Sequence, residues 1–300
     1  DGGGARCSTA PGGSADASID EACNGADDDC DGRVDEGGAC GGDTCETAPP
    51  FDTSAGATGS TAMLEDDYPR SLCLAASPGR DQVFRLEVPA AARWAVAVAP
   101  LTAGYDPLFW VTNGAVCGDS VLNCLGGRAR EAAGRPEGLM VEFQRADSFL
   151  LVVDARGDLS GGPFIASARP AAEGETCGSA IRLGVPARFP GTTEGRTGDV
   201  AGSACPANTL TAGPEQVFRL DLAAPQALRI TAVSGASTDV ALYVTSDCAQ
   251  VDAGCAGGHN AVGNGLAETL DVDLAAGTWF VVVDHVGNQG GPFLLEITPR

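Results

Sequence analysis

Hydrophobic and polar residues alternate with a period of two along several segments of the chain. Residues 82–88 read Gln-Val-Phe-Arg-Leu-Glu-Val, so Phe84, Leu86 and Val88 share one face of an extended strand. The same alternation recurs in two later segments, Phe218–Leu222 and Leu270–Leu274. A polar residue at every second position predicts antiparallel strands that bury one face and expose the other.

Two further segments, Phe149–Val153 and Trp279–Val283, are apolar without interruption. Short runs of this kind predict central strands that are covered on both faces. The chain contains 42 glycines and 18 prolines, which divide the apolar runs as turn residues. Many short strands separated by turns predict an all-β fold of antiparallel β-sandwiches with a jelly-roll-like arrangement.

The chain repeats itself at an interval of about 130 residues, as three pairs of landmarks show. They are Gly-Asp-Thr-Cys at 42–45 with Gly-Glu-Thr-Cys at 174–177, Gln-Val-Phe-Arg-Leu at 82–86 and 216–220, and Gly-Gly-Pro-Phe at 161–164 and 290–293. Their common order predicts two tandem copies of one domain. We expect a leader module at 1–42, a first repeat at 43–170 and a second at 171–300.

The formal net charge of −22 disfavours partners that are themselves negatively charged. Nucleic acids and anionic membrane surfaces are disfavoured, because both attract proteins that present Lys and Arg. All 18 basic residues are Arg, which excludes Schiff-base chemistry, a lysine general base and lysine isopeptide cross-links. The sequence contains no apolar run long enough to insert into a membrane.

Twelve cysteines in an ordered pattern predict disulfides and therefore an oxidising, extracellular environment. Reduced thiols or zinc ligands are the alternative, but the chain has only two His and no Cys-x-x-Cys. In each repeat the first two cysteines are 28 positions apart and the last two are seven apart. This spacing predicts the pairs Cys45–Cys73, Cys117–Cys124, Cys177–Cys205 and Cys248–Cys255. The leader cysteines then pair among themselves, with Cys23–Cys30 and Cys7–Cys40 preferred.

The two repeats resemble the bacterial pre-peptidase C-terminal domain over about residues 42–300. The matching elements are the Gly-Asp-Thr-Cys opening, Gln-Val-Phe-Arg-Leu, 239–244, 276–279 before Val-Val-Val-Asp, and the Gly-Gly-Pro-Phe-Leu-Leu ending. The resemblance implies a β-sandwich that accompanies secreted hydrolases and in some members binds calcium or an insoluble substrate. These 300 residues depart from that setting, because they carry no recognisable catalytic domain.

The leader contains one sharp chemical motif, Cys-Asn-Gly-Ala-Asp-Asp-Asp-Cys-Asp-Gly-Arg-Val-Asp-Glu at 23–36. Carboxylates at alternate positions followed by a glycine are typical of a calcium loop, since calcium binds about six to eight oxygens. The segment resembles a short metal-binding motif of secreted bacterial proteins. It differs from an EF-hand, because loop position twelve is Gly38 and not Glu. The predicted ligands are Asp27, Asp29, Asp31, Asp35 and Glu36 with the carbonyl of Arg33. A solvated acidic linker is the alternative interpretation.

No catalytic constellation is convincing in the sequence. His285 follows Asp284, but Asp284 corresponds to Asp154 of the first repeat, which is followed by Ala155. His259 lies in a glycine-rich stretch and is expected at the surface. The acidic run Glu65–Asp67 favours a loop of like charges. Core packing is expected for the three tryptophans, Trp94, Trp110 and Trp279, whereas an exposed Trp110 beside Tyr105 would favour sugar stacking.

We therefore expect a non-enzymatic extracellular or cell-surface structural protein, such as a subunit of a surface layer, fibre or appendage. The expected partner is a second copy of the chain in a head-to-tail homopolymer, or else an extracellular polysaccharide. The alternatives are an adhesion or carbohydrate-binding module and an accessory region of a larger secreted hydrolase. Calcium is the expected cofactor.

Calcium should bind the leader and stabilise it. At millimolar calcium and a dissociation constant of about 0.1 mM, the stabilisation is about 1.4 kcal/mol. Isothermal and differential scanning calorimetry with calcium and with chelator measure both effects, and Asp31→Asn serves as the ligand-depleted control. Identical melting with and without calcium, together with no heat of binding, would show that the loop is a solvated linker.

Overall fold

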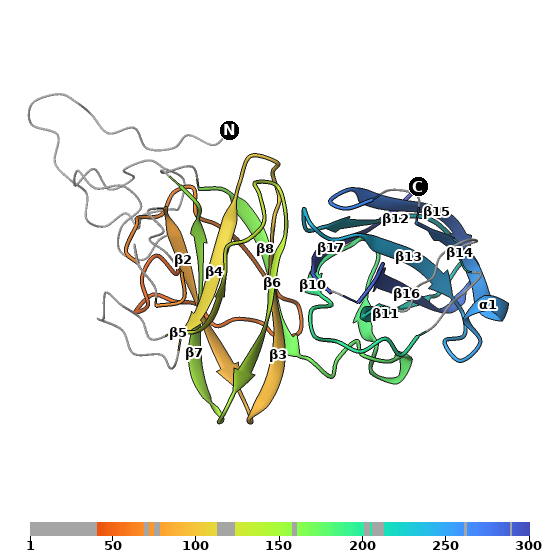
Figure 1. The fold of residues 1–300 in the computed structure, drawn as a ribbon, viewed down its shortest axis with the longest axis horizontal. Helices are drawn as coiled ribbons and strands as arrows, with labels where there is room; N and C mark the ends of the chain where they lie inside the picture. The colour runs from red at the N-terminus through yellow and green to blue at the C-terminus, as the bar shows by residue number, and fades with distance from the viewer. Residues whose placement is uncertain are drawn as a thin grey trace, which may run out of the picture.

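Two β-sandwiches lie side by side in the structure, one built from each repeat (Figure 1). The structure is a computed structural model that describes residues 41–68, 72–74, 79–112, 124–157, 161–200, 205, 213–260, 263–288 and 290–300. Nearly all regular structure in these residues is β-strand, which confirms the predicted all-β fold. Within the same ranges, no helix is long and apolar enough to span a bilayer.

The first sandwich contains the strands of residues 57–170. They are β1 (Ala57–Ser60), β2 (Asp81–Val88), β3 (Ala92–Pro100), β4 (Pro107–Thr112), β5 (Cys124–Arg128), β6 (Glu137–Phe143), β7 (Asp147–Ala155) and β8 (Pro163–Pro170).

The second sandwich repeats this series between residues 181 and 299. Its strands are β9 (Ile181–Leu183), β10 (Ala187–Thr192), β11 (Glu215–Leu222), β12 (Gln226–Ser234), β13 (Val240–Thr245), β14 (Cys255–His259), β15 (Ala267–Leu274), β16 (Gly277–His285) and β17 (Pro292–Pro299). Two short helices accompany them, the 3₁₀ helix η1 (Cys177–Ser179) and α1 (Val251–Gly254).

The strand order is that of a jelly roll in both repeats. The first repeat has the sheets β1-β8-β3-β6 and β2-β7-β4-β5, and the second has β10-β17-β12-β15 and β14-β13-β16-β11-β9. Two four-stranded sheets in this order are the double Greek key of a jelly roll, and in the second repeat β9 adds a fifth strand at the edge of one sheet. The pairs are antiparallel except for the short contact of β9 with β11. In the first repeat an isolated parallel bridge between Pro50 and Arg85 takes its place.

The alternation read from the sequence places the core between the two sheets. In β15 every second residue is buried and the residues between them are exposed, and Phe84, Leu86 and Val88 of β2 all point inward. Equivalent aromatic pairs occupy both cores. Phe84 contacts Phe164 edge to face at 6.1 Å between ring centroids, and Phe218 contacts Phe293 in the same way at 6.1 Å. Such pairs contribute about 0.5–1.5 kcal/mol beyond the area that they bury.

The sheet that contains β2, β7 and β4 is also covered on its outer face. A second apolar cluster of the first repeat combines sheet residues such as Trp110 and Val152 with Cys45 and Tyr68 from the segment before β2. The second repeat has the equivalent cluster around Tyr243. We call these segments the cover of each repeat. They are the described residues within 41–50 and 61–80 of the first repeat and within 174–180 and 193–213 of the second. The predicted double burial of Phe149–Val153 is therefore confirmed.

Small side chains on β3 let the second repeat pack against the first. The outward residues of β3 are Ala95, Ala97 and Ala99, and all three are buried. Strand β10 lies against β3, β6 and β8 at this face. A β-carbon on Gly138 of β6 would lie 2.7 Å from the Cβ atom of Thr192, so the close approach requires glycine there. Nothing in the alternation of hydrophobic and polar residues predicts this contact.

Polar bonds surround the contact between the repeats, which we call the joint. The Arg93 guanidinium donates to the carbonyl of Gly195 at 2.9 Å, and the Ser167 hydroxyl donates to the carbonyl of Pro190 at 2.6 Å. The Arg128 guanidinium pairs with Glu194 across the joint. The joint therefore combines a small apolar centre with a charged border, as non-obligate protein interfaces do.

Candidate functional site

The disulfides connect cysteines in a crossed pattern, which corrects the predicted pairing. The structure joins Cys73 to Cys124, Cys177 to Cys248, and Cys205 to Cys255. The predicted pairs Cys45–Cys73, Cys117–Cys124, Cys177–Cys205 and Cys248–Cys255 are therefore wrong. The first cysteine of the second repeat pairs with the third, and the second pairs with the fourth. Equal spacing in two repeats is satisfied by any pairing that both copies share, so the spacing could not distinguish these patterns.

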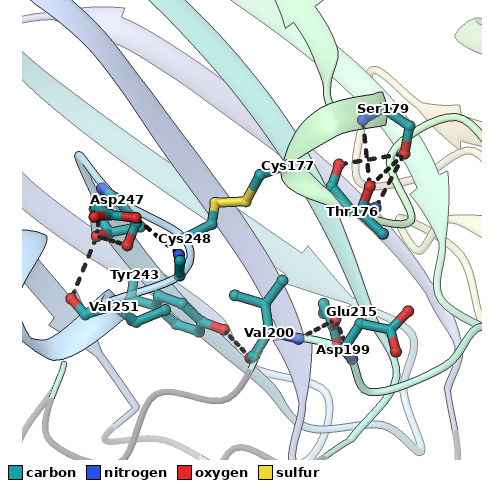
Figure 2. Close-up of a disulfide and its surroundings, with 12 residues drawn as sticks. Thr176, Cys177, Ser179, Asp199, Val200, Glu215, Tyr243, Asp247, Cys248 and Val251 are labelled. Carbon is teal, nitrogen blue, oxygen red and sulfur yellow. Dashed lines mark hydrogen bonds between the residues drawn. A yellow bond between two sulfur atoms is a disulfide. The ribbon is translucent and has the colours of Figure 1, made fainter.

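The crossed disulfides fasten the cover to the sheet beneath it. Cys177, at the start of η1, is joined to Cys248 in the loop after β13 (Figure 2). Their Cα atoms are 6.2 Å apart. Cys205 belongs to the cover and is bonded to Cys255, the first residue of β14. In the first repeat Cys73 and Cys124, the first residue of β5, make the equivalent bond. Two of these bonds therefore anchor the cover to the first residue of a strand, and the third joins η1 to the loop after β13.

The crossed pattern closes longer loops than the predicted one. The sequence separations are 51, 71 and 50 residues. In the chain-entropy model a loop of this length contributes about 4 kcal/mol per disulfide. That amount is comparable to the net stability of a small domain. The cover, which has little regular secondary structure of its own, is therefore held chiefly by covalent bonds.

A buried carboxylate adds a second attachment of the cover in the second repeat. Oε1 of Glu215, the first residue of β11, accepts the backbone N–H groups of Asp199 at 2.6 Å and Val200 at 2.7 Å (Figure 2). The Tyr243 hydroxyl donates to the carbonyl of Val200 at 2.9 Å. Burial raises the pKa of Glu215 to about 7. The side chain thus orders the cover as a hydrogen-bond acceptor, at an electrostatic cost when it is charged.

The first repeat has the same attachment with Asp81 in place of Glu215. Oδ2 of Asp81 accepts the backbone N–H groups of Asp67 at 3.1 Å and Tyr68 at 3.0 Å, and burial raises the pKa of Asp81 to about 9. Asp81 lies opposite Asp154 in the β2–β7 register, as Glu215 lies opposite Asp284. An acidic residue immediately before the repeated Gln-Val-Phe-Arg-Leu in both repeats is the signal in the sequence that could have identified these two side chains.

The two histidines have structural partners. His285 is buried, and its Nδ1 lies 2.6 Å from the Thr193 hydroxyl. Burial lowers the pKa of His285 to about 4, so its neutral form prevails at physiological pH. His259 is half-buried and bonds through Nδ1 to the buried carboxylate of Glu268. The expectation of a surface position for His259 is therefore only partly right.

The tryptophans and the acidic run behave as predicted where the structure describes them. Trp94 and Trp110 are buried, at 3% and 0% exposure, and Trp279 is partly buried against the core. Trp110 therefore offers no platform for a sugar. Residues 65–67 are exposed, and their backbone is used to bond Asp43 and Asp81.

The predicted metal ligands lie outside the described residues. These are Asp27, Asp29, Asp31, Arg33, Asp35 and Glu36, and the leader cysteines Cys7, Cys23, Cys30 and Cys40 lie outside them as well. Cys117 is also outside the described ranges, whereas Cys45 is described and is disulfide-bonded. Within the described ranges, no group of three or more His, Cys, Asp or Glu side chains is arranged to hold a metal ion.

Comparison with known proteins found no matching family model and no matching curated protein. Solved structures do match. One is the pre-peptidase C-terminal domain of a collagenase from Bacillus anthracis, with 15% identity and a TM-score of 0.28, covering 39% of this chain and 92% of that domain.

Two other matches are carbohydrate-binding proteins by name. The tandem CBM22 domains of Xyn10C from Paenibacillus barcinonensis share 12% identity at a TM-score of 0.19, covering 83% of this chain and 85% of that one. A fucolectin from striped bass, Morone saxatilis, shares 8% identity at a TM-score of 0.18, covering 72% and 86%. The fold therefore rests on the strand order and register described above.

Disulfide mapping by mass spectrometry should recover the crossed pattern. Peptides that join Cys73 to Cys124, Cys177 to Cys248 and Cys205 to Cys255 are expected, and the repeat correspondence predicts that Cys45 joins Cys117. Thiol titration of the denatured, unreduced protein should find essentially no free thiol. A peptide that joins Cys177 to Cys205 would contradict the pairing, and one that joins Cys45 elsewhere would contradict the correspondence.

Glu215→Gln should flatten the dependence of stability on pH. The folded state raises the pKa of Glu215 from 4.5 to about 7, so its contribution is most favourable below about pH 4.5 and is lost as the pH rises toward 7. Glutamine stays neutral and can accept the same two N–H groups. The variant should therefore gain up to about 3 kcal/mol relative to wild type above pH 7.

Chemical denaturation at several pH values measures this difference. Glu46→Gln is the control, because Glu46 is an exposed carboxylate in the other repeat. If Glu215→Gln instead destabilises the protein equally at pH 4.5 and pH 8, the charged carboxylate is not the costly form.

Proposed function

We propose that this chain is a non-enzymatic extracellular structural protein in which two stapled jelly rolls form one building block. The observation that supports this best is the shared cover attachment, a crossed disulfide with a buried carboxylate, in both repeats. Disulfides persist outside the cell, where glutathione does not reduce them. Disulfides that anchor loops make a protein more resistant to unfolding, which a structural subunit outside the cell needs.

The joint supports the idea of one block rather than two independent modules. The contacts that cross it include an ion pair, hydrogen bonds from side chains to backbone carbonyls, and a cation–π contact of Arg169 with Phe189 at 5.8 Å. Arg196 is buried beside the segment that connects the repeats. Its guanidinium donates to the carbonyls of Ala171 at 2.8 Å and Glu173 at 3.1 Å. These bonds fix the connecting segment to the second repeat, as a load-transmitting subunit requires.

The structural bonds of the candidate acid–base groups support a non-enzymatic role in this proposal. His285 is committed to Thr193 in a buried position, and Glu215 and Asp81 are committed to backbone N–H groups. We further propose that the repeats are related to the pre-peptidase C-terminal domain, on the sequence motifs named above. An accessory role beside a secreted hydrolase is the corresponding alternative.

Calcium enters the proposal as the ion that orders the leader. The carboxylates of Asp27, Asp29 and Asp31 repel one another unless a cation binds between them. Bound calcium supplies the positive charge that offsets this repulsion, and the ordered leader can then contact a neighbouring subunit. This part of the proposal rests on the sequence motif.

Assembly would proceed through the leader rather than through further copies of the joint. The face of β3 that receives the second repeat is lined with alanine, but the corresponding residues of β12 are Arg229, Thr231 and Val233. Arg229 forms an ion pair with Asp271 on that face. A polar face with paired charges is a poor acceptor for another apolar contact. We therefore propose that the leader of one subunit meets the second repeat of the next, in a head-to-tail homopolymer.

Sedimentation velocity tests the assembly directly. In millimolar calcium the chain should form species larger than the monomer, and chelation should return the monomer. Asp31→Asn, which removes one predicted calcium ligand, should stay monomeric in calcium. A wild-type protein that remains monomeric at high concentration in calcium would contradict assembly and favour the binding-module alternative.

A further inference from the structure

A polar cleft of about 700 Å³ opens at the joint. Its walls come from the end of β5 and the start of β6 in the first repeat, and from four loops at one end of the second. The lining includes Arg128, Arg130, Glu131, Glu137, Glu194 and Asp239, with Asn264 and Asn288 beside them. Clefts between modules, bordered by loops, are common ligand sites.

Most charged groups of the cleft are already engaged. Arg128 pairs with Glu194, and Nε of Arg128 also donates to the carbonyl of Gly138 at 2.8 Å. Glu131 accepts the backbone N–H of Ala236 across the joint. These contacts build the walls and neutralise one carboxylate with one guanidinium.

Two carboxylates are left with acceptor capacity. Glu137 is 1% exposed; its Oε1 accepts the backbone N–H of Glu131 at 2.6 Å, but no hydrogen bond reaches its Oε2 in the described structure. Asp239 is half-buried, and its side chain forms no hydrogen bond or ion pair among the described residues. A buried carboxylate oxygen without a donor is costly, because its desolvation is not compensated.

The remaining positive group is Arg130, which is exposed. The acidic groups of the cleft therefore outnumber the basic ones, and the most deeply buried of them, Glu137, keeps one oxygen without a donor. A ligand that suits this balance carries positive charge and several N–H donors.

We propose that this cleft binds an organic cation, a guanidinium or ammonium group, whose N–H donors reach Glu137 and Asp239. Such a site goes beyond the structural role and does not depend on assembly. A metal ion fits less well, because the described side chains include no metal-ligand group. A sugar is disfavoured, because none of the residues that line the cleft is aromatic and Trp110 is buried.

The test is calorimetric titration of the full chain with N-acetyl-arginine methylamide, its lysine counterpart, and the neutral citrulline analogue. The cationic probes should bind and the citrulline analogue should not. At pH 8, above the pKa of about 7 to which burial raises Glu137, Glu137→Gln and Asp239→Asn should each weaken binding by about tenfold, because each replaces a carboxylate with a neutral amide. Glu46→Gln, an exposed carboxylate outside the cleft, should leave binding unchanged and control for the overall negative charge.

Agmatine, a guanidinium without a peptide backbone, distinguishes the two sources of this chemistry. Equal or tighter binding of agmatine would indicate a small-molecule ligand, and preference for the capped arginine would indicate a side chain of a polypeptide. The proposal is overturned if the citrulline analogue binds equally well, or if no cationic probe binds at millimolar concentration. It is also overturned if Glu46→Gln weakens binding as much as Asp239→Asn, or if only calcium binds in the cleft. None of these outcomes bears on sedimentation, so this site and the assembly can fail separately.

Discussion

One sheet of each jelly roll is apolar on both faces, and this constraint governs the rest of the molecule. In the first repeat Phe109 and Val153 face the core, while Trp110 and Val152 on the same two strands face outward. An uncovered outer face would expose a large apolar surface to water. The cover solves this with little secondary structure of its own, so its order has to come from elsewhere. Disulfides and the carboxylates of Asp81 and Glu215 supply that order, one by limiting the unfolded chain and the other by bonding backbone N–H groups.

The outer face of the other sheet differs between the two repeats, and that difference makes their contact asymmetric. Alanines on β3 allow β10 to approach closely, and Gly138 has no β-carbon that would clash with Thr192. On β12 the corresponding face carries Arg229 and Thr231 and stays in water. That face therefore lacks the small apolar side chains that let β10 pack on β3. The cleft is a by-product of this asymmetric contact, since it forms where loops of one repeat meet a strand end of the other.

The strand pattern was predictable because it depends on local alternation that the sequence displays directly. The alternating burial of β15 and the double burial of Phe149–Val153 follow from single-residue periodicity. The disulfide pattern was not, because equal spacing fits any pairing that both repeats share, and only the fold brings Cys177 to Cys248. The joint was hidden for a related reason. Alanine at 95, 97 and 99 and glycine at 138 form no recognisable motif in the sequence. Their small size matters only because the second repeat packs against them.

Covalent bonds and buried acids also divide the work of holding the cover. A disulfide stabilises at any pH at which it remains oxidised, since its effect lies mainly in the unfolded chain. The stabilisation that Asp81 and Glu215 give to the cover decreases as pH rises, because burial favours their neutral forms. The carboxylates would loosen the cover at alkaline pH if they acted alone. The crossed disulfides close the same loops and are insensitive to that titration, so the acids can order the backbone without deciding whether the cover stays in place.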